Sequence, residues 1–453
     1  MANDYDVIVL GAGPAGQHCA TRLSGGGLRV AIAERELVGG ECDYWACIPS
    51  KTLLRPGEAL AAAREAPGAR EAIGGGLDVA SLLEWRDFMV SDYDDTAKAA
   101  WLEESGIALL RGAAALAGPG RVEVDGSEYS TEHVVIATGS DAVVPPVEGL
   151  REAEGVWTNR EVTALKEVPK RLLVLGGGPV GVEMAQAVAR MGASVVLVES
   201  SDHVLAREPA ALGKALGEAL AAEGVEFHFG QHASALRVDD GEYVLVLEDE
   251  TELRGDRLLV ATGRSPSVDG LGLDTVGIEP SKKGIEVDSR MSAGDGIWAI
   301  GDVTGVWPLT YVGKYQGRVA ADNILGKPRE ANYDAVPRVV FTDPQAAAVG
   351  EAEGAFTATA PISGVPRLPT YTREYAEKNG FLTLVSDGER ITGAYALGPD
   401  AGEWLQQATL AIRAKVPLGV MVDTIQPFPT FSEIFLNVLT ELEATVVKGS
   451  DPS

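Results

Sequence analysis

The sequence is poor in cysteine and in basic residues, and each shortage excludes a class of protein. Three cysteines among 453 residues are too few for the disulfide framework of a secreted protein. Lys and Arg number 38 against 66 Asp and Glu, and the net charge of −28 argues against nucleic acid or an anionic membrane surface as a partner. No run of about 18 apolar residues is present, and no secretory pattern precedes the first predicted strand. We therefore expect a cytoplasmic protein without a membrane span.

Histidine is also scarce, and its distribution is informative. None of the five histidines follows His232, so the C-terminal part of the chain has no imidazole for acid–base chemistry near neutral pH. The length predicts two to four domains, because a single core rarely grows beyond about 250–300 residues. The high glycine content of 54 residues fits alternating strands and helices joined by tight turns.

The chain contains a degenerate repeat of strand, glycine turn, helix and strand. The first copy has strands at 6–10 and 29–34 around a helix that ends near residue 23. The second has strands at 171–175 and 194–199 around a helix that ends near residue 191. In each copy an acid, Glu34 or Glu199, lies 23 residues after the first glycine of the turn. The turn residues are Gly11, Gly13, Pro14, Ala15 and Gly16 in the first copy and Gly176, Gly178 and Gly181 in the second.

This pattern is that of the dinucleotide-binding unit, and its spacing has a physical reason. The first glycine allows a tight turn, the second lets the backbone approach a pyrophosphate, and the third lets the helix pack close to the strand. The phosphate then lies at the helix N-terminus, where free N–H groups and the helix dipole favour an anion. The distal acid accepts hydrogen bonds from a ribose. Two complete copies predict two nucleotide sites.

Three further strand ends carry candidate cofactor-binding residues. Two strands end in the same Ala-Thr-Gly sequence, at 137–139 and 261–263, where the chain would leave a nucleotide-binding unit. A third strand, at 298–300, is followed by Gly301 and Asp302, which are well placed to hold a cofactor hydroxyl or phosphate. The candidates at these ends are Thr138, Gly139, Gly263, Arg264, Gly301 and Asp302.

The character of the sequence changes after about residue 330. Residues 337–344, 381–385 and 391–397 predict strands, and 402–415 and 432–444 predict helices. This part has no nucleotide fingerprint, so we expect a separate α+β domain that serves packing or dimerisation.

A close cysteine pair, Cys42 and Cys47, lies a short way after the first glycine turn. Two thiols separated by four residues, beside a dinucleotide site, indicate a redox couple that exchanges electrons with a bound cofactor. Zinc is disfavoured because there is no second cysteine pair. Cys19 lies within the first predicted helix and is interpreted as a small buried apolar residue.

Together these motifs resemble the class I pyridine nucleotide-disulfide oxidoreductases, the flavoprotein family of dihydrolipoamide dehydrogenase, glutathione reductase and mercuric reductase. The resemblance covers about residues 4–445. It implies an α/β fold with two Rossmann-like dinucleotide-binding domains, for FAD and NAD, and a C-terminal α+β dimerisation domain. The expected ranges are 1–152 and 276–330 for the FAD-binding domain, 153–275 for the NAD(P)H-binding domain and 331–453 for the dimerisation domain. A homodimer is implied as well.

The resemblance also implies cofactor contacts. FAD would lie on the first glycine turn, with Glu34 on its adenosine ribose and Asp302 on its ribityl–pyrophosphate side. The nicotinamide nucleotide would lie on the second turn, near Glu199. Gly40 and Lys51 are further expected cofactor-binding residues.

The expected catalytic residues are Cys42, Cys47, Lys51 and Glu183. By the resemblance, Cys47 is the thiolate that faces the flavin, and Cys42 is the interchange thiol that attacks the substrate. Lys51 would lie near flavin N5, where its charge stabilises the reduced anionic ring, and would pair with Glu183.

The sequence departs from the family at the C-terminal base. Phe428 stands where the family has a histidine, and a phenyl ring neither donates nor accepts a proton. Efficient lipoamide or glutathione turnover is therefore not expected, because loss of a general acid–base costs about 10²–10⁴-fold. In the family, that histidine pairs with the acid at the position of Glu433. Here Glu433 has lost this partner and is either a helix-start acid or has another role. Tyr44 and Trp45, between the cysteines, either pack into the core or offer a stacking surface.

The nicotinamide nucleotide expected is NADH, with NADPH as the second candidate. Glu199 accepts hydrogen bonds from ribose hydroxyls and repels a 2′-phosphate. Arg207 is the single arginine that follows soon after, slightly displaced from where NADPH enzymes of this family carry theirs.

We predict an FAD-dependent NAD(P)H oxidoreductase that passes hydride to flavin and then electrons to the Cys42–Cys47 disulfide, with a small-molecule terminal acceptor. The alternatives are a diaphorase or quinone reductase that uses the flavin directly, an enzyme similar to dihydrolipoamide dehydrogenase or mercuric reductase, and a non-catalytic subunit that holds FAD. A mercuric reductase is disfavoured because residues 447–453 contain no cysteine pair.

Overall fold

The computed structural model describes residues 3–367 and 380–450. Its internal packing divides the chain into two compact units. The first contains residues 1–49, 84–143 and 263–332, and the second contains 50–83, 144–262 and 333–453. Helices α3 (Cys47–Glu65) and α4 (Val79–Met89) run from one unit into the other. The finer division into three domains remains a prediction.

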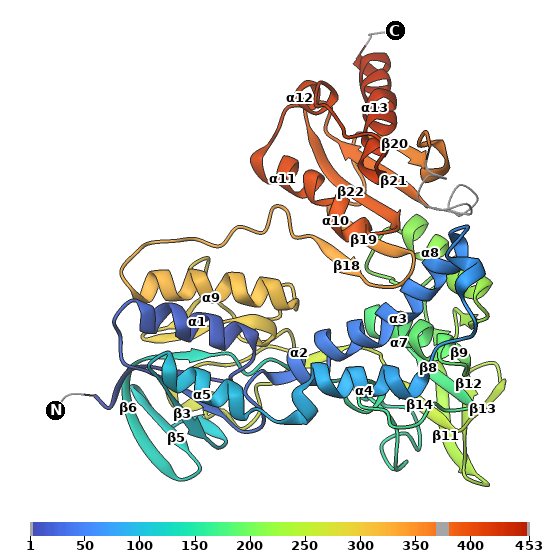
Figure 1. Ribbon diagram of the computed structural model, residues 1–453. Helices are drawn as coiled ribbons and strands as arrows, with labels where there is room; N and C mark the ends of the chain where they lie inside the picture. The colour runs from blue at the N-terminus through green and yellow to red at the C-terminus, as the bar shows by residue number, and fades with distance from the viewer. Residues whose placement is uncertain (1–2, 368–379, 451–453) are drawn as a thin grey trace. The chain divides into compact units, whose positions relative to one another are not determined.

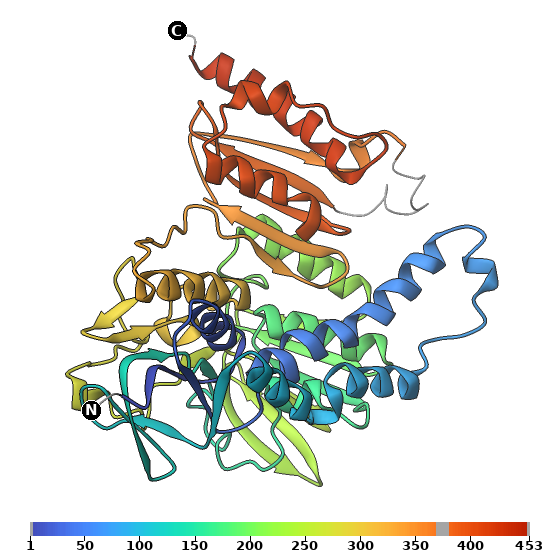
Figure 2. The ribbon, with the colours of Figure 1, turned by 60° about the vertical axis from the view of Figure 1, so that its left-hand side comes forward.

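The first unit is built on a mostly parallel sheet in the order β16-β17-β6-β1-β2-β3. Strand β1 is fully buried from Val7 to Leu10, as expected when both faces of a parallel sheet are covered. Helices α1 and α9 lie side by side on one face (Figures 1 and 2). The strands are β1 (Tyr5–Leu10), β2 (Val30–Glu34), β3 (Ile107–Arg111), β6 (Ser127–Ile136), β16 (Ser292–Gly294) and β17 (Ile297–Ala299). The helices are α1 (Pro14–Gly25), α2 (Gly40–Tyr44), α5 (Thr96–Glu104) and α9 (Thr310–Ile324).

Small residues bring α1 and α9 close together. A Cβ on Gly313 would lie 3.1 Å from the Cβ of Ala15, and one on Gly317 would lie 2.9 Å from the carbonyl oxygen of Ala15. This close crossing places the start of α9 near the first glycine turn. Strands β4 (Ala114–Leu116) and β5 (Arg121–Val124) extend from β6, and β7 (Ser140–Ala142) pairs with β15 (Arg264–Pro266).

The second unit contains a parallel four-stranded sheet in the order β10-β9-β8-β14. An antiparallel sheet of β11, β12 and β13 follows β10 along the chain. The strands are β8 (Arg171–Leu175), β9 (Ser194–Glu199), β10 (Glu226–Phe229), β11 (Ala233–Asp239), β12 (Glu242–Leu247), β13 (Glu252–Gly255) and β14 (Arg257–Val260). The helices are α6 (Asn159–Thr163), α7 (Pro179–Arg190) and α8 (Ala210–Ala222). Strand, glycine turn, helix and strand thus occur in both units, as the repeat predicts.

The C-terminal part of the second unit is an antiparallel sheet in the order β18-β19-β22-β21-β20, with α11 and α13 on one face (Figure 2). The other face packs against α8, because Ala346, Ala348 and Leu397 share a core with Leu212 and Leu216. The strands are β18 (Arg338–Val340), β19 (Gln345–Gly350), β20 (Phe356–Pro361), β21 (Phe381–Ser386) and β22 (Ile391–Gly398). The helices are α10 (Ala401–Trp404), α11 (Gln406–Ala414), α12 (Leu418–Val422) and α13 (Ile434–Ser450).

The α/β class with two nucleotide-binding units and an α+β C-terminal part is confirmed. Three sequence expectations were wrong in detail. The strand expected over 337–344 covers only Arg338–Val340, which form β18. Instead of the single helix expected over 402–415, the structure has two helices, α10 and α11, which meet at Leu405. The helix expected from residue 432 begins at Ile434, because residues 431–433 form a short 3₁₀ turn. Strands β19 and β20 had no clear sequence signal. Within residues 3–367 and 380–450, no helix is long and apolar enough to cross a membrane.

Candidate active site

The first glycine turn has the geometry that its spacing requires. Gly11 has φ +104°, and a Cβ there would lie 2.5 Å from the carbonyl oxygen of Ala137. A Cβ on Gly16 would lie 2.0 Å from the carbonyl oxygen of Gly11, so only glycine lets α1 pack against β1. Gly13 differs, because no atom lies within 4 Å of its hypothetical Cβ. The space beside Gly13 is open and could admit a ligand.

Glu34 shapes this turn from the end of β2. One of its carboxylate oxygens accepts a hydrogen bond from the N–H of Ala12 at 2.7 Å, and the other accepts one from the N–H of Glu36 at 2.8 Å. Gly40, at the start of α2, also lies against the turn, since its Cβ would be 3.0 Å from the Cα of Gly13. Pro14 occupies the first turn of α1, and no side chain caps that helix. Its first N–H groups are therefore available to an anion.

The second turn repeats this geometry in the other unit. Gly176 has φ +109°, and its Cβ would lie 2.5 Å from the carbonyl oxygen of Ala261. A Cβ on Gly181 would lie 1.9 Å from the carbonyl oxygen of Gly176, whereas one on Gly178 would have its nearest neighbour at 4.0 Å. Glu199 accepts a hydrogen bond from the N–H of Gly177 at 2.7 Å. No side chain caps α7.

Both turns therefore fit a dinucleotide. Each combines an open space beside the middle glycine, an uncapped helix N-terminus and a buried carboxylate at the end of the next strand. An isolated buried carboxylate is costly unless it is hydrogen-bonded, and here backbone N–H groups hold it in place. The pyrophosphate of a bound cofactor would lie at the helix start, and its ribose would lie near the carboxylate.

Asp302 is held by a hydrogen-bond chain within the first unit. Ser140 Oγ donates to Asp302 Oδ2 at 2.7 Å, and the guanidinium of Arg264 donates to Ser140 Oγ at 2.8 Å. Arg264 also pairs with Glu41 on α2, with 3.5 Å between the charged atoms. The N–H of Gly301 donates to the fully buried Gln316 at 2.6 Å.

The two Ala-Thr-Gly ends lead into the paired strands β7 and β15. The hydroxyl of Thr138 donates to the carbonyl of Ser267 at 2.7 Å, so it serves the backbone of this connection. Gly139 and Gly263 have φ of +77° and +139°, with no atom near their hypothetical Cβ atoms. Both glycines let the chain turn sharply as it leaves its parallel sheet.

The two cysteines converge on one hydroxyl. Cys42 lies on α2, Cys47 begins α3, and Thr310 begins α9. Thr310 Oγ1 is 3.2 Å from Cys47 Sγ and 3.4 Å from Cys42 Sγ. The pKa of the Cys42 thiol is raised well above its usual value, first by a hydrogen bond with Cys47 and then by burial. The structure therefore brings the predicted redox pair together as two adjacent thiols.

The aromatic residues between the cysteines have different environments. Tyr44 is 1% exposed, and its hydroxyl donates to the carbonyl of Val38 at 3.2 Å. Its ring packs against Trp45 and Tyr93, and the ammonium of Lys98 lies 4.6 Å from its centre. Tyr44 is thus a core residue, so only the half-buried Trp45 remains as a candidate stacking surface.

Lys51 and Glu183 meet in the second unit. Lys51 Nζ is 2.7 Å from a carboxylate oxygen of the buried Glu183 and 4.7 Å from the centre of the Phe341 ring. The other carboxylate oxygen of Glu183 accepts a hydrogen bond from the N–H of Phe341 at 2.9 Å. The two residues named as partners therefore form an ion pair, and their catalytic roles remain a prediction.

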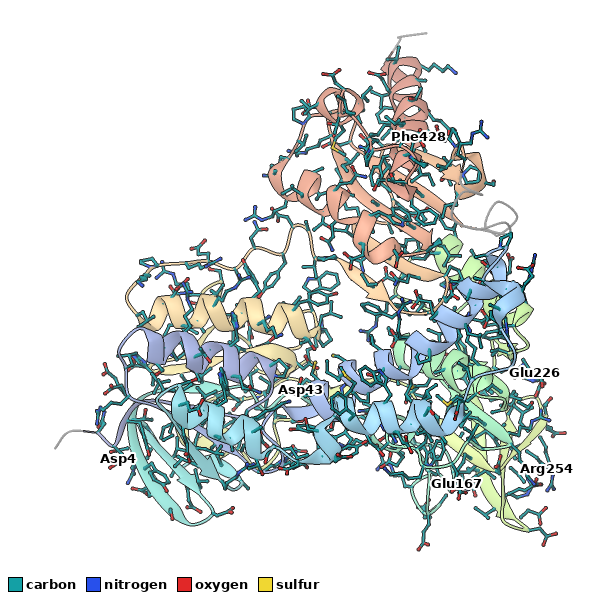
Figure 3. All side chains as sticks on the ribbon, viewed as in Figure 1. Asp4, Asp43, Glu167, Glu226, Arg254 and Phe428 are labelled. Carbon is teal, nitrogen blue, oxygen red and sulfur yellow. The ribbon has the colours of Figure 1, made fainter. Side chains whose placement is uncertain are left out.

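Phe428 is 62% exposed on the C-terminal part of the chain (Figure 3). Glu433 lies in the 3₁₀ turn before α13. One of its carboxylate oxygens is buried and has no hydrogen-bond partner among the described residues. Glu433 is thus a helix-start acid with an unused acceptor.

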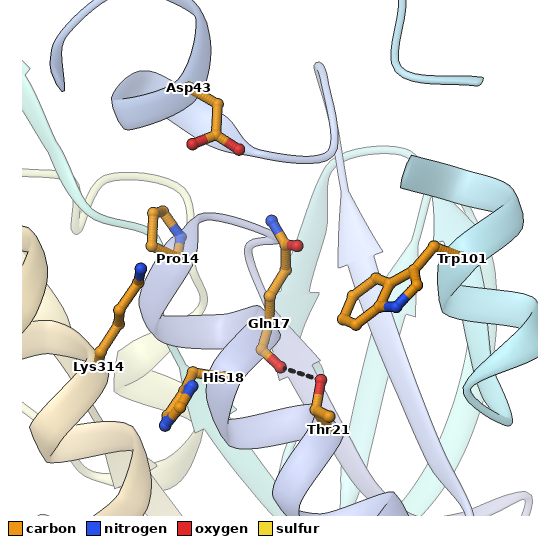
Figure 4. Close-up of a pocket in the computed structure, with 7 residues that line it drawn as sticks. All are labelled: Pro14, Gln17, His18, Thr21, Asp43, Trp101 and Lys314. Carbon is orange, nitrogen blue, oxygen red and sulfur yellow. Dashed lines mark hydrogen bonds between the residues drawn. The ribbon is translucent and has the colours of Figure 1, made fainter. Parts of the chain in front are cut away.

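A cavity of about 270 Å³ lies over the outer face of α1 (Figure 4). The amine of Lys314 and the ring of Trp101 flank this helix on opposite sides. The pKa of His18 is lowered, first by burial and then by Arg318 and Lys314 nearby. The residues that line the cavity include Gln17, His18, Thr21, Asp43, Trp101 and Lys314.

Sequence reasoning missed Thr310, Ser140 and Gln316. Thr310 and Ser140 act on residues far away in the chain, since Thr310 is 268 residues from Cys42 and Ser140 is 162 residues from Asp302. A threonine at a helix start has no pattern that separates it from a helix cap. Cys19 was interpreted correctly, since it is fully buried and burial raises its pKa to about 12.

Comparison with known proteins identifies the family. Residues 5–317 match the family model for pyridine nucleotide-disulphide oxidoreductases, and residues 336–438 match the dimerisation domain of the same family. The chain is 36% identical over 446 residues to the dihydrolipoyl dehydrogenase of Thermus scotoductus, covering 95% of each chain. It is 31% identical over 450 residues to a mercuric reductase of Lysinibacillus sphaericus, covering 95% of this chain and 81% of that protein.

A solved structure shows the same arrangement. The HOCl-induced flavoprotein disulfide reductase RclA from Escherichia coli superimposes with a TM-score of 0.85 at 27% identity, covering 96% of this chain and 99% of that one. Family members bind FAD and use NAD(P)H. The chain belongs to the pyridine nucleotide-disulphide oxidoreductases, NAD(P)H-dependent flavoenzymes that pass electrons to a disulfide.

Proposed function

We propose that Cys42 and Cys47 are the redox disulfide of this enzyme and that they pass electrons from NAD(P)H to a small-molecule acceptor. The observation that carries this proposal is the meeting of the two sulfurs at the hydroxyl of Thr310, in the unit that holds the first glycine turn. Both cysteines are free thiols and are in hydrogen-bond contact, so this geometry corresponds to the reduced state of the pair.

FAD would be held by the first turn and the nicotinamide nucleotide by the second. When bound, they supply hydride transfer and a two-electron store. Gly13 leaves room for the pyrophosphate, and Glu34 and Asp302 would orient hydroxyl groups of the cofactor. In the second unit, Gly178 would leave room for the pyrophosphate of the nicotinamide nucleotide, and Glu199 would orient its hydroxyl groups.

NADH is the preferred nucleotide in this proposal. Glu199 is buried, and one of its oxygens already accepts hydrogen bonds from Ser200 and Ser201. A 2′-phosphate placed beside this carboxylate would meet a like charge in a region of low dielectric constant. A ribose 2′-hydroxyl can instead donate a hydrogen bond to it.

The chemistry at the cysteines balances without a further oxidant. A hydride from NAD(P)H carries two electrons and one proton, so reduction breaks the Cys42–Cys47 bond and leaves one thiol and one thiolate. With a disulfide acceptor, the Cys42 sulfur attacks and releases one thiol, and Cys47 then displaces the second and restores the enzyme disulfide. The first leaving thiol needs a proton, and Phe428 cannot supply one.

The cavity over α1 supports a small acceptor with an anionic group. Its wall includes Asp43, the residue after Cys42 on α2. Lys314 forms no ion pair among the residues that the structure describes, so its ammonium is free to bind an anion. His18 and Gln17 add hydrogen-bonding groups, and Trp101 adds an apolar wall. A volume of about 270 Å³ suits a ligand smaller than most drug molecules.

A homodimer is the third part of the proposal. Residues 336–438 match the dimerisation domain of the family. Four large apolar side chains in this region, Leu410, Val420, Ile425 and Phe428, are between 55% and 93% exposed. We infer that these side chains contribute to the dimer interface, since a contiguous exposed apolar patch marks an interaction site.

The test is anaerobic titration of the purified protein with NADH, followed by a count of thiols that react with a thiol reagent. The wild-type protein should be yellow, should bleach on NADH addition and should gain two reactive thiols. Cys42→Ser should bleach but gain none, whereas Cys19→Ala, which alters a buried thiol outside the pair, should behave as wild type.

An acceptor screen then separates the two enzyme alternatives. If turnover passes through the disulfide, Cys42→Ser should abolish it for every acceptor. Quinone turnover that survives in Cys42→Ser at the wild-type rate would show that the flavin is oxidised directly and would refute the cysteine pathway. Absence of bleaching by NADH or NADPH would favour a non-catalytic subunit.

A further inference from the structure

Lys98, on α5, contacts the two residues that follow Cys42 on α2. Its ammonium forms an ion pair with the carboxylate of Asp43 and lies 4.6 Å from the centre of the Tyr44 ring. The Tyr44 ring is almost fully buried, whereas the side chains of Lys98 and Asp43 are 33% and 27% exposed. An ammonium over the face of an aromatic ring is attracted to it, so Lys98 makes two favourable contacts with α2.

The backbone at Gly39 shows how closely these three side chains are packed. Gly39 precedes α2 and has φ +130°. A Cβ at this position would lie 2.8 Å from the Asp43 carboxylate, from Lys98 Nζ and from the Tyr44 ring. The ion pair and the ring therefore meet directly beside the backbone, at a position that only glycine can occupy.

A second contact from the start of α5 fixes the chain that leads into α2. A carboxylate oxygen of Asp95 accepts a hydrogen bond from the N–H of Val38 at 2.7 Å, and the Tyr44 hydroxyl donates to the carbonyl of Val38 at 3.2 Å. Arg111 pairs with Asp95 at 2.7 Å, so the charge of Asp95 is balanced within the unit. Residues three apart on a helix lie on the same face, and Asp95 and Lys98 therefore hold this segment together.

The carboxylate of Asp43 lies where it can oppose reduction of the cysteine pair. Reduction converts a neutral disulfide into a thiol and a thiolate, so the reduced pair carries an additional negative charge. The pKa of the Cys42 thiol is raised first by the hydrogen bond with Cys47, and the charge of Asp43 contributes in the same direction. The ammonium of Lys98 places an opposite charge against this carboxylate and offsets its repulsion.

We propose that Lys98 is a positioning residue that acts through Asp43: it holds this carboxylate in place and offsets its charge, so that the carboxylate does not oppose reduction of the Cys42–Cys47 disulfide. The hydride from NAD(P)H supplies the two electrons and the proton, and the S–S bond breaks. Lys98 and Asp43 transfer no atom and act only by charge and position. The inference rests on the proposed redox role of the cysteine pair.

The test measures the disulfide equilibrium of the FAD-loaded protein against dithiothreitol, without oxygen and at a fixed pH. Dithiothreitol gives up two electrons and two protons and closes its own disulfide ring, while the Cys42–Cys47 bond breaks to form the reduced pair. Acid quenching and alkylation, followed by mass spectrometry, give the reduced fraction in each mixture. The tryptic peptide of residues 36–51 contains both cysteines of the pair and excludes Cys19.

Lys98→Met should shift this equilibrium toward the disulfide by about two- to fivefold, the size expected for charges that are partly exposed to solvent. Asp43→Asn should shift it in the opposite direction, and Lys98→Arg, which keeps the charge, should stay close to wild type. In the double variant Lys98→Met/Asp43→Asn the two shifts should cancel, because both charges are gone. Lys327→Met removes a lysine beyond the end of α9 in the same unit and should have no effect.

A wild-type equilibrium in Lys98→Met would overturn the inference. A shift that persists in the double variant would overturn it as well, because Lys98 would then act through its packing on Tyr44 and not through Asp43. If Lys98→Met does not retain FAD, Lys98→Gln is measured in the same way, and Asp43→Asn still tests the opposite shift. Failure of the proposed function is a separate result, because the wild-type protein would then gain no reactive thiols when it is reduced with NADH.

Discussion

At the scale of single residues, the chemistry depends on which atoms can hold a proton. Cys42 has its pKa raised first by the hydrogen bond with Cys47. We therefore expect Cys42 in the reduced enzyme to be labelled slowly by iodoacetamide near neutral pH and faster as pH rises. Cys47→Ala removes that hydrogen bond, so the pKa of Cys42 should fall and labelling should begin at lower pH. Labelling profiles that coincide for the two proteins would show that this hydrogen bond does not control the pKa of Cys42.

Phe428 is the second residue with a direct chemical consequence. The structure leaves Glu433 with a buried, unpartnered carboxylate oxygen close by in sequence, among the residues that it describes. Phe428→His should raise turnover of lipoamide by about tenfold or more, because it restores a proton donor for the leaving thiol. Phe428→Leu is the matched control and should not change turnover. The rate of flavin reduction by NADH should be equal in all three proteins.

The wild-type protein offers a further check on the role of Phe428. Lipoamide turnover at roughly 10–10³ per second, typical of enzymes, would show that no histidine is needed. Slow turnover with normal flavin reduction would instead locate the defect after the first half of the reaction.

At the scale of elements, the glycine turns separate folding from cofactor binding. A Cβ at Gly13 meets no protein atom within 4 Å, so Gly13→Ala should fold normally. The same methyl group would occupy the space that a pyrophosphate needs, and FAD content should fall about tenfold or more, since a clash of this kind costs at least about 1.4 kcal/mol. The FAD released on denaturation, per mole of protein, measures this.

Gly25→Ala is the control for that substitution. Gly25 ends α1, and its Cβ also meets no protein atom, but it lies away from the turn. It should fold and retain FAD fully. Equal FAD content in the Gly13 and Gly25 variants would mean that the cofactor does not approach this turn.

At the scale of the whole molecule, the question is what covers the exposed apolar residues of the C-terminal part. Ile425 is 93% exposed, and burying a side chain of its size in an assembly would contribute about 1.5–3 kcal/mol. We expect a homodimer at micromolar concentration by light scattering, and Ile425→Glu should shift it toward monomer. Val238→Glu changes an exposed apolar residue of β11, outside the dimerisation region, and should leave the dimer intact. A wild-type monomer would rule the dimer out.

The sequence by itself determined the features that depend on local backbone geometry. Glycine turns such as Gly11–Gly16, with Glu34 at a fixed distance along the chain, predict strand, turn and helix, because positive φ and close packing are properties of a few consecutive residues. The cysteine pair and the absence of histidine beyond His232 were equally readable from the residues alone. The cysteine pair and the two glycine turns indicated the family and its cofactors, whereas the missing histidine marked a departure from that family.

Only the tertiary structure decided which distant residues complete the site. Thr310 reaches Cys42 across 268 positions, and Ser140 reaches Asp302 across 162. Neither pairing leaves a local pattern, because each depends on how whole elements pack, as α1 and α9 do through Gly313 and Gly317. The burial of Tyr44, which removes it as a substrate platform, was decided in the same way. Short-range rules of backbone conformation can be read along one chain, whereas long-range contacts exist only once the core has formed.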